Sequence, residues 1–224
     1  MPVGDHDSQT IEWMRHGQMW SARAFYDAIV KLGLPYKSVL DVGCCTGEWL
    51  RVFQNAGCGD IFGIDSPHIE DSWLVIPKDR FMRHDLDHPF DLKRQFQLVI
   101  CLETAEHVQP ASADVLVECL VRHGDIILFG AAIPGQGGAG HVNEQRPEYW
   151  VEKFALHGYR VVDCIRPLVW DVHMCEYWYQ NNALVFATPD AIEKHPRLKA
   201  GLEKTAPPEQ LLRYHPKRWP DGGP

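Results

Sequence analysis

Apolar positions along the chain gather into short runs separated by mixed segments. Four runs are almost continuously apolar and have the length of strands: 38–43, 60–65, 98–103 and 125–132. A fifth segment, 81–86, is also strand-like. Strands that are apolar throughout are typical of sheets buried on both faces, so the pattern predicts a largely parallel sheet with helices on each side.

Segments with helical spacing lie between these runs. They are predicted at 48–56, 112–122 and about 146–159. The alternation of strands and helices indicates an α/β protein with a doubly wound sheet. Two more apolar segments, 160–170 and 183–187, complete about seven strands. We expect them to form an antiparallel pair at the sheet edge, because the stretch between them looks too short for a crossover helix.

Two helices are predicted before the first strand, around 11–19 and 21–31. The second has an apolar stripe of Phe25, Ile29 and Leu32. Gly33 and Pro35 then end it. At the other end of the chain, the tail after Pro189 is rich in Pro, Lys and Glu and predicts a helix or two with a frayed end.

Length and composition agree with one globular domain. The 224 residues are 45% hydrophobic and 23% charged, and we expect N-terminal helices at 1–36, a core at 37–190 and a tail at 191–224. A net charge of −8 argues against a general nucleic-acid binder. We find no signal peptide and no run of about 18 apolar residues, so a cytoplasmic protein without a membrane partner is expected. The oligomeric state stays open.

The cysteines and histidines do not form a recognisable metal motif. Seven cysteines are an odd number, several lie in apolar segments, and no two C-x-x-C units occur. His84 and His88 flank Asp85, but no established site has this spacing. We therefore expect reduced cysteines and no bound metal.

The first strand ends in an acidic turn, "VLDVGCCTGEW" at 39–49. A dinucleotide-binding turn has three glycines that let the backbone approach a pyrophosphate. Here the corresponding positions are Gly43, Cys45 and Gly47. Asp41 and Glu48 would repel a phosphate and attract a cation. The turn therefore favours a nucleoside that carries a positive charge.

Acids also end the next two strands. Asp65, followed by Ser66, lies 24 residues beyond Asp41, near the spacing at which an acid accepts both ribose hydroxyls of an adenosine. Asp85 ends the third strand, where it can accept the adenine amino group while Leu86 provides an apolar wall. Ribose, adenine and a cationic tail together describe S-adenosylmethionine.

In this order and spacing, the segments over roughly 38–190 resemble class I S-adenosylmethionine-dependent methyltransferases. "VLDVGCCTGEW" is similar to their glycine-rich first motif, with Cys45 as a departure, "GIDS" to the acidic second motif, and "HDL" to the adenine-contacting one. "LVICLETAEHV" is similar to the fourth-strand segment that lines the methionine moiety. The resemblance implies a Rossmann-like methyltransferase fold whose N-terminal helices form a lid. The implied cofactor site consists of Asp41, Gly43, Cys45, Gly47, Asp65, Ser66, Asp85, Leu86, Cys101, Leu102 and Glu103.

Candidate catalytic residues come first from a long glycine-rich loop, 135–150, after the fifth strand. It resembles a segment of bacterial methyltransferases of small molecules and natural products. The loop carries His141, Asn143 and Glu144. His141 is the leading candidate for a general base, because histidine titrates near neutral pH. The alternative is that His141 caps the next helix or binds the loop.

Two other groups of side chains are candidates. His107 follows the fourth strand with Glu103 and Glu106, and either acts on the substrate or shapes the turn with them. Tyr177 and Tyr179 lie in "EYWYQNN", expected to be a turn, and we expect only one of them to face the pocket and bind the acceptor.

Aromatic side chains on the N-terminal helices can also serve the cofactor. Trp13 and Trp20 lie there, and aromatic faces attract a sulfonium by cation–π interaction. Packing is the alternative role for such residues.

The favoured function is methyl transfer from S-adenosylmethionine to a small natural-product or sugar-like molecule. One alternative is an enzyme that closes the cofactor's own aminobutyrate chain to azetidine-2-carboxylate and releases methylthioadenosine. Another is a cofactor-binding scaffold that supports a partner subunit without turnover. The polar loop around His141 argues against the scaffold.

Overall fold

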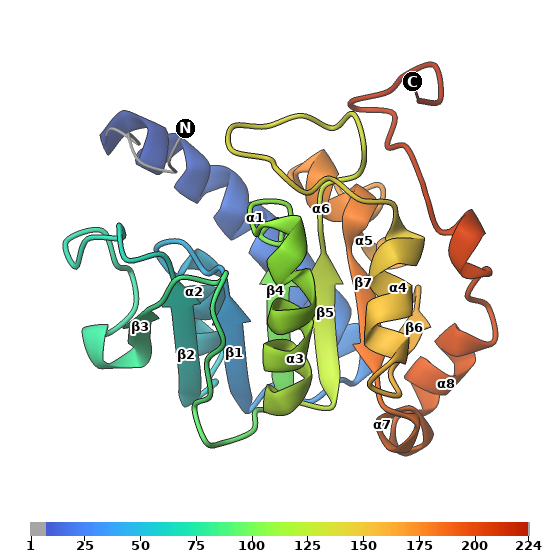
Figure 1. The fold of residues 1–224 in the computed structure, drawn as a ribbon, viewed down its shortest axis with the longest axis horizontal. Helices are drawn as coiled ribbons and strands as arrows, with labels where there is room; N and C mark the ends of the chain where they lie inside the picture. Colours follow the sequence, from blue (N-terminus) through green and yellow to red (C-terminus); the bar gives the residue numbers. More distant parts are fainter. Residues whose placement is uncertain (1–7, 224) are drawn as a thin grey trace.

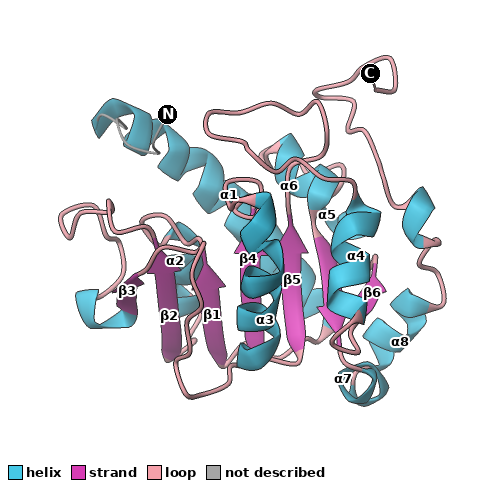
Figure 2. Ribbon diagram, in the orientation of Figure 1, coloured by secondary structure: helices cyan, strands magenta, loops and turns pink. Residues whose placement is uncertain are grey.

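A seven-stranded sheet forms the centre of the computed structural model, which describes residues 8–223 and their side chains from residue 17 onward (Figures 1 and 2). The strand order is β3-β2-β1-β4-β5-β7-β6. The strands are β1 (Ser38–Val42), β2 (Asp60–Asp65), β3 (Phe81–Arg83), β4 (Leu98–Leu102), β5 (Ile126–Gly130), β6 (Arg160–Val162) and β7 (Leu184–Ala187). The doubly wound sheet predicted from the sequence is confirmed.

The reversed strand is β7, which pairs antiparallel with both β5 and β6. The pairs among β1 to β5 are parallel. The final two strands are thus antiparallel to each other, as expected. The reversed strand lies one place in from the edge, and β6 forms the edge itself.

Helices cover both faces of the sheet. On one face lie α3 (Ala113–His123) and α4 (Pro147–Ala155), and on the other lie α1 (Ser8–Leu32) and α2 (Glu48–Asn55) (Figure 1). Alternate residues of β4 point into the two cores: Ile100 packs on the side of α1 and α2, and Cys101 on the side of α3. Burial on both faces explains the nearly continuous apolar runs of the strands.

A single helix, α1, replaces the two helices expected at 11–19 and 21–31. Gly17 and Ser21 do not interrupt it, because both lie against Glu176. The Oγ of Ser21 donates to Gly17 O (2.8 Å) and accepts from the backbone N–H of Glu176 (3.0 Å). The prediction of two helices was wrong because this tertiary contact stabilises positions with low helix propensity.

The N-terminal half of α1 extends past the carboxyl edge of the sheet (Figure 1). Its place near this edge suits the expected lid, which stays a prediction. The side chain of Trp13 lies outside the described residues, and Trp20 is 52% exposed.

Three other segments differ from the predictions. The strand expected at 81–86 ends at Arg83, because the chain turns there: Asp85 Oδ1 accepts from the backbone N–H of Asp87 (3.1 Å). The strand expected at 160–170 ends at Val162, because the chain then forms the short helix α5 (Arg166–Val169). The expected turn at 176–182 is a helix, α6 (Tyr177–Asn182).

A buried ion pair stabilises these two short helices. Arg166 is 1% exposed and makes a bidentate pair with Asp163, with N···O distances of 2.9 and 2.6 Å. The same guanidinium donates to the carbonyl oxygens of Asn181 (3.1 Å) and Leu211 (2.8 Å). The sequence prediction missed the helices because this pairing depends on tertiary contacts with α6 and the tail.

The C-terminal tail contains α7 (Pro189–Lys194) and α8 (Pro196–Leu202), which confirms the predicted helix or two. Beyond the short 3-10 helix η3 (Pro208–Gln210), the chain returns along α6. The backbone N–H of His215 donates to Asn181 Oδ1 (2.9 Å), and Lys217 Nζ donates to Gln180 Oε1 (2.9 Å). The tail thereby holds α6 at the rim of the sheet. No helix in the described part of the chain is long and apolar enough to cross a membrane.

Candidate active site

The turn after β1 has an unusual backbone that its sequence permits. Gly43, Cys45 and Gly47 have positive φ angles of 82°, 50° and 95°. A Cβ at Gly43 would lie 2.0 Å from Oγ1 of Thr104, so only glycine fits there. The backbone N–H of Gly43 donates to Ile64 O (2.8 Å), which ties the turn to β2.

Asp65, the last residue of β2, organises this turn. Its Oδ2 accepts from the backbone N–H of Cys45 (2.6 Å), and its Oδ1 accepts from that of Ser66 (2.5 Å). Burial raises the pKa of Asp65, and these two hydrogen bonds lower it. Each oxygen retains a lone pair, so the carboxylate can also accept two vicinal hydroxyls.

Asp41 and Glu48 bring two more acids to the turn. Asp41 is 3% exposed, and its Oδ2 has no hydrogen-bond partner among the described residues. Burial raises the pKa of Asp41 well above its usual value, and the charges of Asp65 and Glu48 raise it further. Glu48 accepts a hydrogen bond from Thr46 Oγ1 (2.5 Å). A cationic ligand fits this end of the site, because it would offset the repulsion among the carboxylates.

The other residues expected at the cofactor lie less close together. The side chain of Asp85 is 58% exposed and pairs with Nδ1 of His88 (3.3 Å), and Leu86 is half-buried. Cys101 and Leu102 are buried in β4, so only their backbone can line a ligand. The structure thus brings together the residues around β1 and β2, whereas the Asp85 carboxylate points to solvent.

Glu103 directly follows β4 and adopts a positive φ of 51°. Its backbone N–H donates to Gly130 O (2.8 Å). Both carboxylate oxygens are held: Oε2 accepts from Gln136 Nε2 and Oε1 from Asn182 Nδ2, each at 2.8 Å. Burial raises the pKa of Glu103 to about 7, and the two hydrogen bonds oppose the rise. A carboxyl that titrates near neutral pH is suited to proton transfer.

The glycine-rich loop packs on the turn that follows β4. The backbone N–H groups of Val142 and Asn143 both donate to Glu106 O (2.9 and 3.0 Å). His141 Nδ1 lies 2.8 Å from Oε1 of Glu144, and His107 Nδ1 lies 3.2 Å from Gly140 O. The two imidazoles meet edge to face, with ring centroids 4.9 Å apart.

Asn143 anchors this loop. It is 2% exposed, its Nδ2 donates to Ala105 O (3.4 Å), and its Oδ1 accepts from Gln145 Nε2 (3.0 Å). The structure therefore gives its side chain a role in loop shape, and a catalytic role for Asn143 stays a prediction.

The two tyrosines separate because α6 is a helix. Tyr179 is buried, with its ring 5.1 Å from that of Trp49 and 6.4 Å from that of Phe25. Tyr177 is half-buried, and burial raises its pKa, with a further contribution from the charge of Glu103. Of the two, only Tyr177 is partly exposed, and its role in binding the acceptor stays a prediction.

Comparison with known proteins supports this interpretation of the turn and strands. Residues 12–120 match the family described as "Methyltransferase domain". The chain carries a class I S-adenosylmethionine-dependent methyltransferase domain. S-adenosylmethionine is the cofactor of this domain, and the predicted Rossmann-like methyltransferase fold is confirmed. No curated protein matches the sequence.

Several solved structures share the fold of this methyltransferase domain. One is a sugar N-methyltransferase from Streptoalloteichus sp ATCC 53650, at 17% identity and a TM-score of 0.60, which covers 84% of this chain and 96% of that one. An S-adenosylmethionine-bound amino pentose methyltransferase from Micromonospora echinaspora is 15% identical, with a TM-score of 0.55 and coverage of 84% and 99%. Magnesium protoporphyrin IX methyltransferase from Synechocystis PCC 6803, with bound SAH, is 17% identical, with a TM-score of 0.55 and coverage of 83% and 90%.

Two polar residues at the site of the methyltransferase domain were not predicted from the sequence. Gln136 and Asn182 hold Glu103 and also contact each other, with Asn182 Nδ2 donating to Gln136 Oε1 (2.9 Å). Gln136 is one of three side-chain amides in the glycine-rich loop, and Asn182 ends a segment predicted to be a turn. Neither position carries a signal that would connect it with Glu103.

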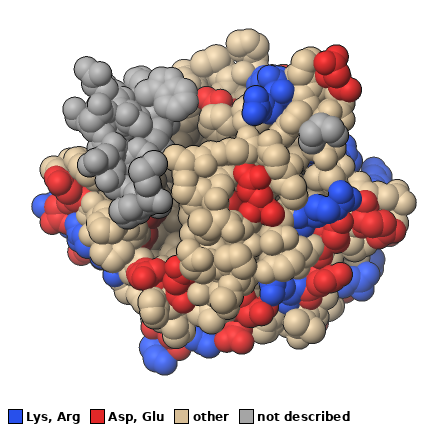
Figure 3. All heavy atoms as spheres, turned by 45° about the horizontal axis from the view of Figure 1, so that its top comes forward, with Lys and Arg blue, Asp and Glu red and all other residues tan. Residues whose placement is uncertain are grey.

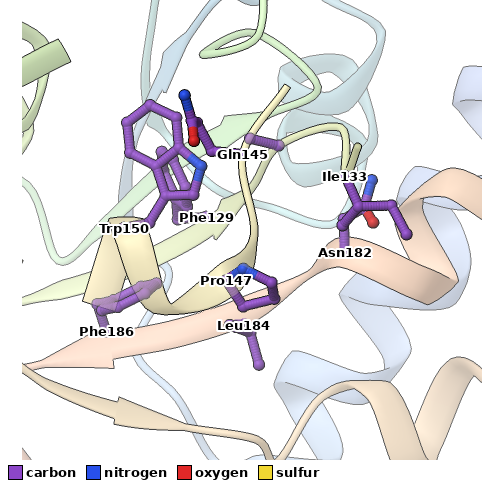
Figure 4. A pocket seen from close by; sticks show the side chains of 9 residues that line it. Phe129, Ile133, Gln145, Pro147, Trp150, Asn182, Leu184 and Phe186 are labelled. Atoms are coloured by element: carbon purple, nitrogen blue, oxygen red, sulfur yellow. The ribbon is translucent and has the colours of Figure 1, made fainter. Parts of the chain in front are cut away.

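A small apolar cavity lies beneath the loop, between β5, β7 and α4 (Figure 4). Trp150, Phe129 and Phe186 line one end, and Asn182 lies at the other, near Ile133. Because Asn182 also contacts Glu103, the cavity ends against the amide network of the site and not at the β1 turn.

Charged residues are interspersed on the face that contains the carboxyl edge of the sheet. Among the described residues drawn in Figure 3, Lys and Arg form no broad patch, and much of the face is uncharged. This surface agrees with the net charge of −8 in favouring a small acceptor over a polyanion.

Proposed function

We propose that this domain transfers the methyl group of S-adenosylmethionine to a small, polar natural-product or sugar-like acceptor. The observation that carries this proposal is the half-buried Glu103 carboxylate, which titrates near neutral pH between the cofactor turn and the glycine-rich loop. Two of the similar structures are named as sugar and amino pentose methyltransferases, which supports the acceptor class.

The acids around β1 and β2 suit the cofactor end of the site. Asp65 offers both carboxylate oxygens to the ribose hydroxyls, while its own backbone contacts keep it in place. The Oδ2 of Asp41, which has no partner among the described residues, can accept from the amino group of the methionine moiety. Charge-assisted hydrogen bonds of this kind contribute about 1.5 to 3 kcal/mol each.

Glu103 is suited to remove the acceptor's proton. The acceptor oxygen or nitrogen attacks the methyl carbon, and the bond from sulfur to that carbon breaks. The electron pair stays on sulfur, which leaves neutral S-adenosylhomocysteine, and the acceptor's proton passes to a Glu103 oxygen. Gln136 and Asn182 hold this carboxylate in one orientation, so the base is positioned before the acceptor arrives.

His141 was the base expected from the sequence, and it stays a candidate. Its contact with Glu144 supports the alternative of a loop-binding role, since Glu144 also accepts from the backbone N–H groups of Gly135 (2.9 Å) and Gly137 (2.7 Å). Glu103 is the stronger candidate because both of its oxygens are held by side chains and its pKa matches neutral pH.

The products decide among transfer, cyclisation and a scaffold. The purified protein is incubated with S-adenosylmethionine alone and then with a panel of aminosugars and polyols. We expect S-adenosylhomocysteine only after an acceptor is added. Methylthioadenosine formed without acceptor, faster than in buffer, would establish the cyclase instead. Cofactor binding without any product across a broad acceptor panel would support the scaffold.

A further inference from the structure

Two imidazoles and a carboxylate converge beside the proposed acceptor site. One ligand atom from each of Glu106, His107 and His141 lies within 4.8 Å of the other two. Glu106 and His107 follow β4, whereas His141 comes from the loop after β5, so the group forms only in the folded domain. Hydrogen bonds from the 142–143 backbone to Glu106 O hold the two segments together.

The ring hydrogens of both histidines are assigned by their partners. Gly140 O can only accept, so Nδ1 of His107 carries the proton in that contact. Oε1 of Glu144 plays the same role for Nδ1 of His141. Both rings then present an Nε2 lone pair. An imidazole whose Nδ1–H binds a carbonyl or carboxylate oxygen is the usual form of a metal-ligating histidine.

Glu106 adds a carboxylate that the protein does not fully satisfy. The residue is 1% exposed, and its Oε2 has no hydrogen-bond partner among the described residues. Its carboxylate accepts backbone hydrogen bonds from Ala132 and from its own residue. A buried carboxylate oxygen without a partner is costly, unless a cation or a donor from a ligand meets it.

We propose that Glu106, His107 and His141 bind a divalent transition-metal ion. Two imidazoles and one carboxylate favour ions such as Zn²⁺, Co²⁺ or Fe²⁺ over Mg²⁺ or Ca²⁺, which prefer all-oxygen sites. With bonds of about 2.0 to 2.2 Å, the ligand atoms of a bound ion lie about 3 to 3.5 Å apart. The glycine-rich loop that carries His141 allows the small closure this requires, with positive φ at Gly137 and Gly140.

Three protein ligands leave coordination positions open for the acceptor. If the proposed methyl transfer holds, an acceptor hydroxyl would bind there and become more acidic, which favours an oxygen nucleophile. His141 is then a ligand, and Glu103 remains the group that takes the proton. No metal was expected from the sequence, because neither the cysteine spacing nor the spacing around His84 and His88 matches an established site.

The test measures metal binding by the full chain without a tag and without cofactor or acceptor. After chelator treatment, the protein is titrated with Co²⁺ by visible absorption and with Zn²⁺ by calorimetry. We expect one ion per chain. His141→Gln and Glu106→Gln each weaken binding by at least tenfold, and Glu144→Gln weakens it by about 10- to 100-fold through the orientation of His141.

Two variants make the result specific. Gly138→Ala keeps every ligand but places a Cβ 2.2 Å from Nε2 of His141, so it too should weaken the binding of the ion. His88→Gln is the matched control, because it alters the exposed His88–Asp85 pair and leaves the proposed site unchanged. Circular dichroism checks each variant's folding, and His107→Gln replaces Glu106→Gln if the latter does not fold.

The proposal is overturned if the wild-type protein binds no ion, if ligand variants bind as well as wild type, or if His88→Gln loses binding equally. S-adenosylmethionine affinity, measured with chelator present, reports the cofactor site separately. Methyl transfer by a protein that binds no ion would therefore remove the metal proposal and leave the proposed function intact.

Discussion

The two ends of the site hold their carboxylates by different means. Asp65 is held by backbone N–H groups, from Cys45 at a separation of 20 residues and from its neighbour Ser66. Glu103 is held by side-chain amides from Gln136 and Asn182, which lie 33 and 79 residues away. One end is organised by backbone near two adjacent strands, whereas the other is assembled from a loop and a helix far along the chain.

This difference separates what the fold requires from what a substrate selects. Backbone donors are present whatever the side chains are, so the cofactor end forms wherever the β1 turn and β2 are in place. Side-chain donors can be exchanged by substitution without disturbing the sheet. We therefore expect the end around Glu103 to determine the acceptor and the end around Asp65 to determine the cofactor.

The largest effect is expected at the end of the site around Glu103. Glu103→Gln should lower the rate of methyl transfer by about 10²- to 10⁴-fold, because it removes the base. The wild-type rate should rise with pH through about 7 as Glu103 loses its proton, and the variant should lack this rise. Glu118→Gln, on the exposed side of α3, is the control. A variant rate within a few-fold of wild type would leave His141 as the base.

Stability gives a second measurement for Glu103→Gln that needs no acceptor. The pKa of Glu103 is raised on folding, from an ordinary 4.5 to about 7. Its contribution is therefore fully present below pH 4.5 and is lost as pH rises through about 7. Relative to the variant, the wild type should lose free energy of unfolding between pH 5 and pH 8. Equal pH dependence in denaturant titrations of both proteins would show that Glu103 is not perturbed.

Cofactor binding tests the end of the site around Asp65. Asp65→Ala should weaken the binding of S-adenosylmethionine by about 2 to 3 kcal/mol, since it removes the charged acceptor of two ribose hydroxyls. Asp85→Ala should cost less, because that carboxylate is exposed and pairs with His88. Isothermal titration calorimetry compares the two. A larger loss for Asp85→Ala would place the adenosine against β3 in the way the sequence suggested.

A substitution at Gly43 tests how strictly the backbone of the β1 turn is fixed. Gly43→Ala should lower the free energy of unfolding by about 1 to 3 kcal/mol, because φ is positive and the Cβ would collide with Thr104. At Gly59, a Cβ meets nothing within 4 Å, so Gly59→Ala serves as the control. Chemical denaturation measures both, and equal losses would contradict a specific role for the turn.

The smallest effect is expected from a positioning residue. Asn182→Ala removes one donor that favours the charged form of Glu103, so the pH–rate profile should shift to higher pH. At pH 7 the rate should fall several-fold, with S-adenosylmethionine affinity unchanged. Asn55→Ala, at the exposed end of α2, controls for general effects. A lower rate with an unshifted profile would mean that Asn182 acts only through structure.

The sheet and the first turn were predictable because their signals are local. Apolar runs such as 98–103 reflect burial on both faces, and the acids at positions 41 and 65 lie at or next to the carboxyl ends of adjacent strands. The errors arose where distant contacts override local preference. Gly17 stays helical against Glu176, and α6 forms where Arg166 and the tail stabilise it. Position 85 ends a predicted strand, but its exposed carboxylate accepts a hydrogen bond from the backbone of the turn that follows.

The sequence by itself determined the class of fold and the place of the cofactor turn. Strand burial and the backbone of a glycine turn depend on residues that are neighbours in the sequence, so they can be recognised without knowing the rest of the chain. Only the tertiary structure decided which groups face the acceptor. Gln136 and Asn182 meet Glu103, and His141 meets His107, through contacts between segments whose spacing carries no local pattern. The physical reason is that burial and side-chain pairing, which set the pKa of Glu103 and the chemistry of the histidines, depend on the packed chain.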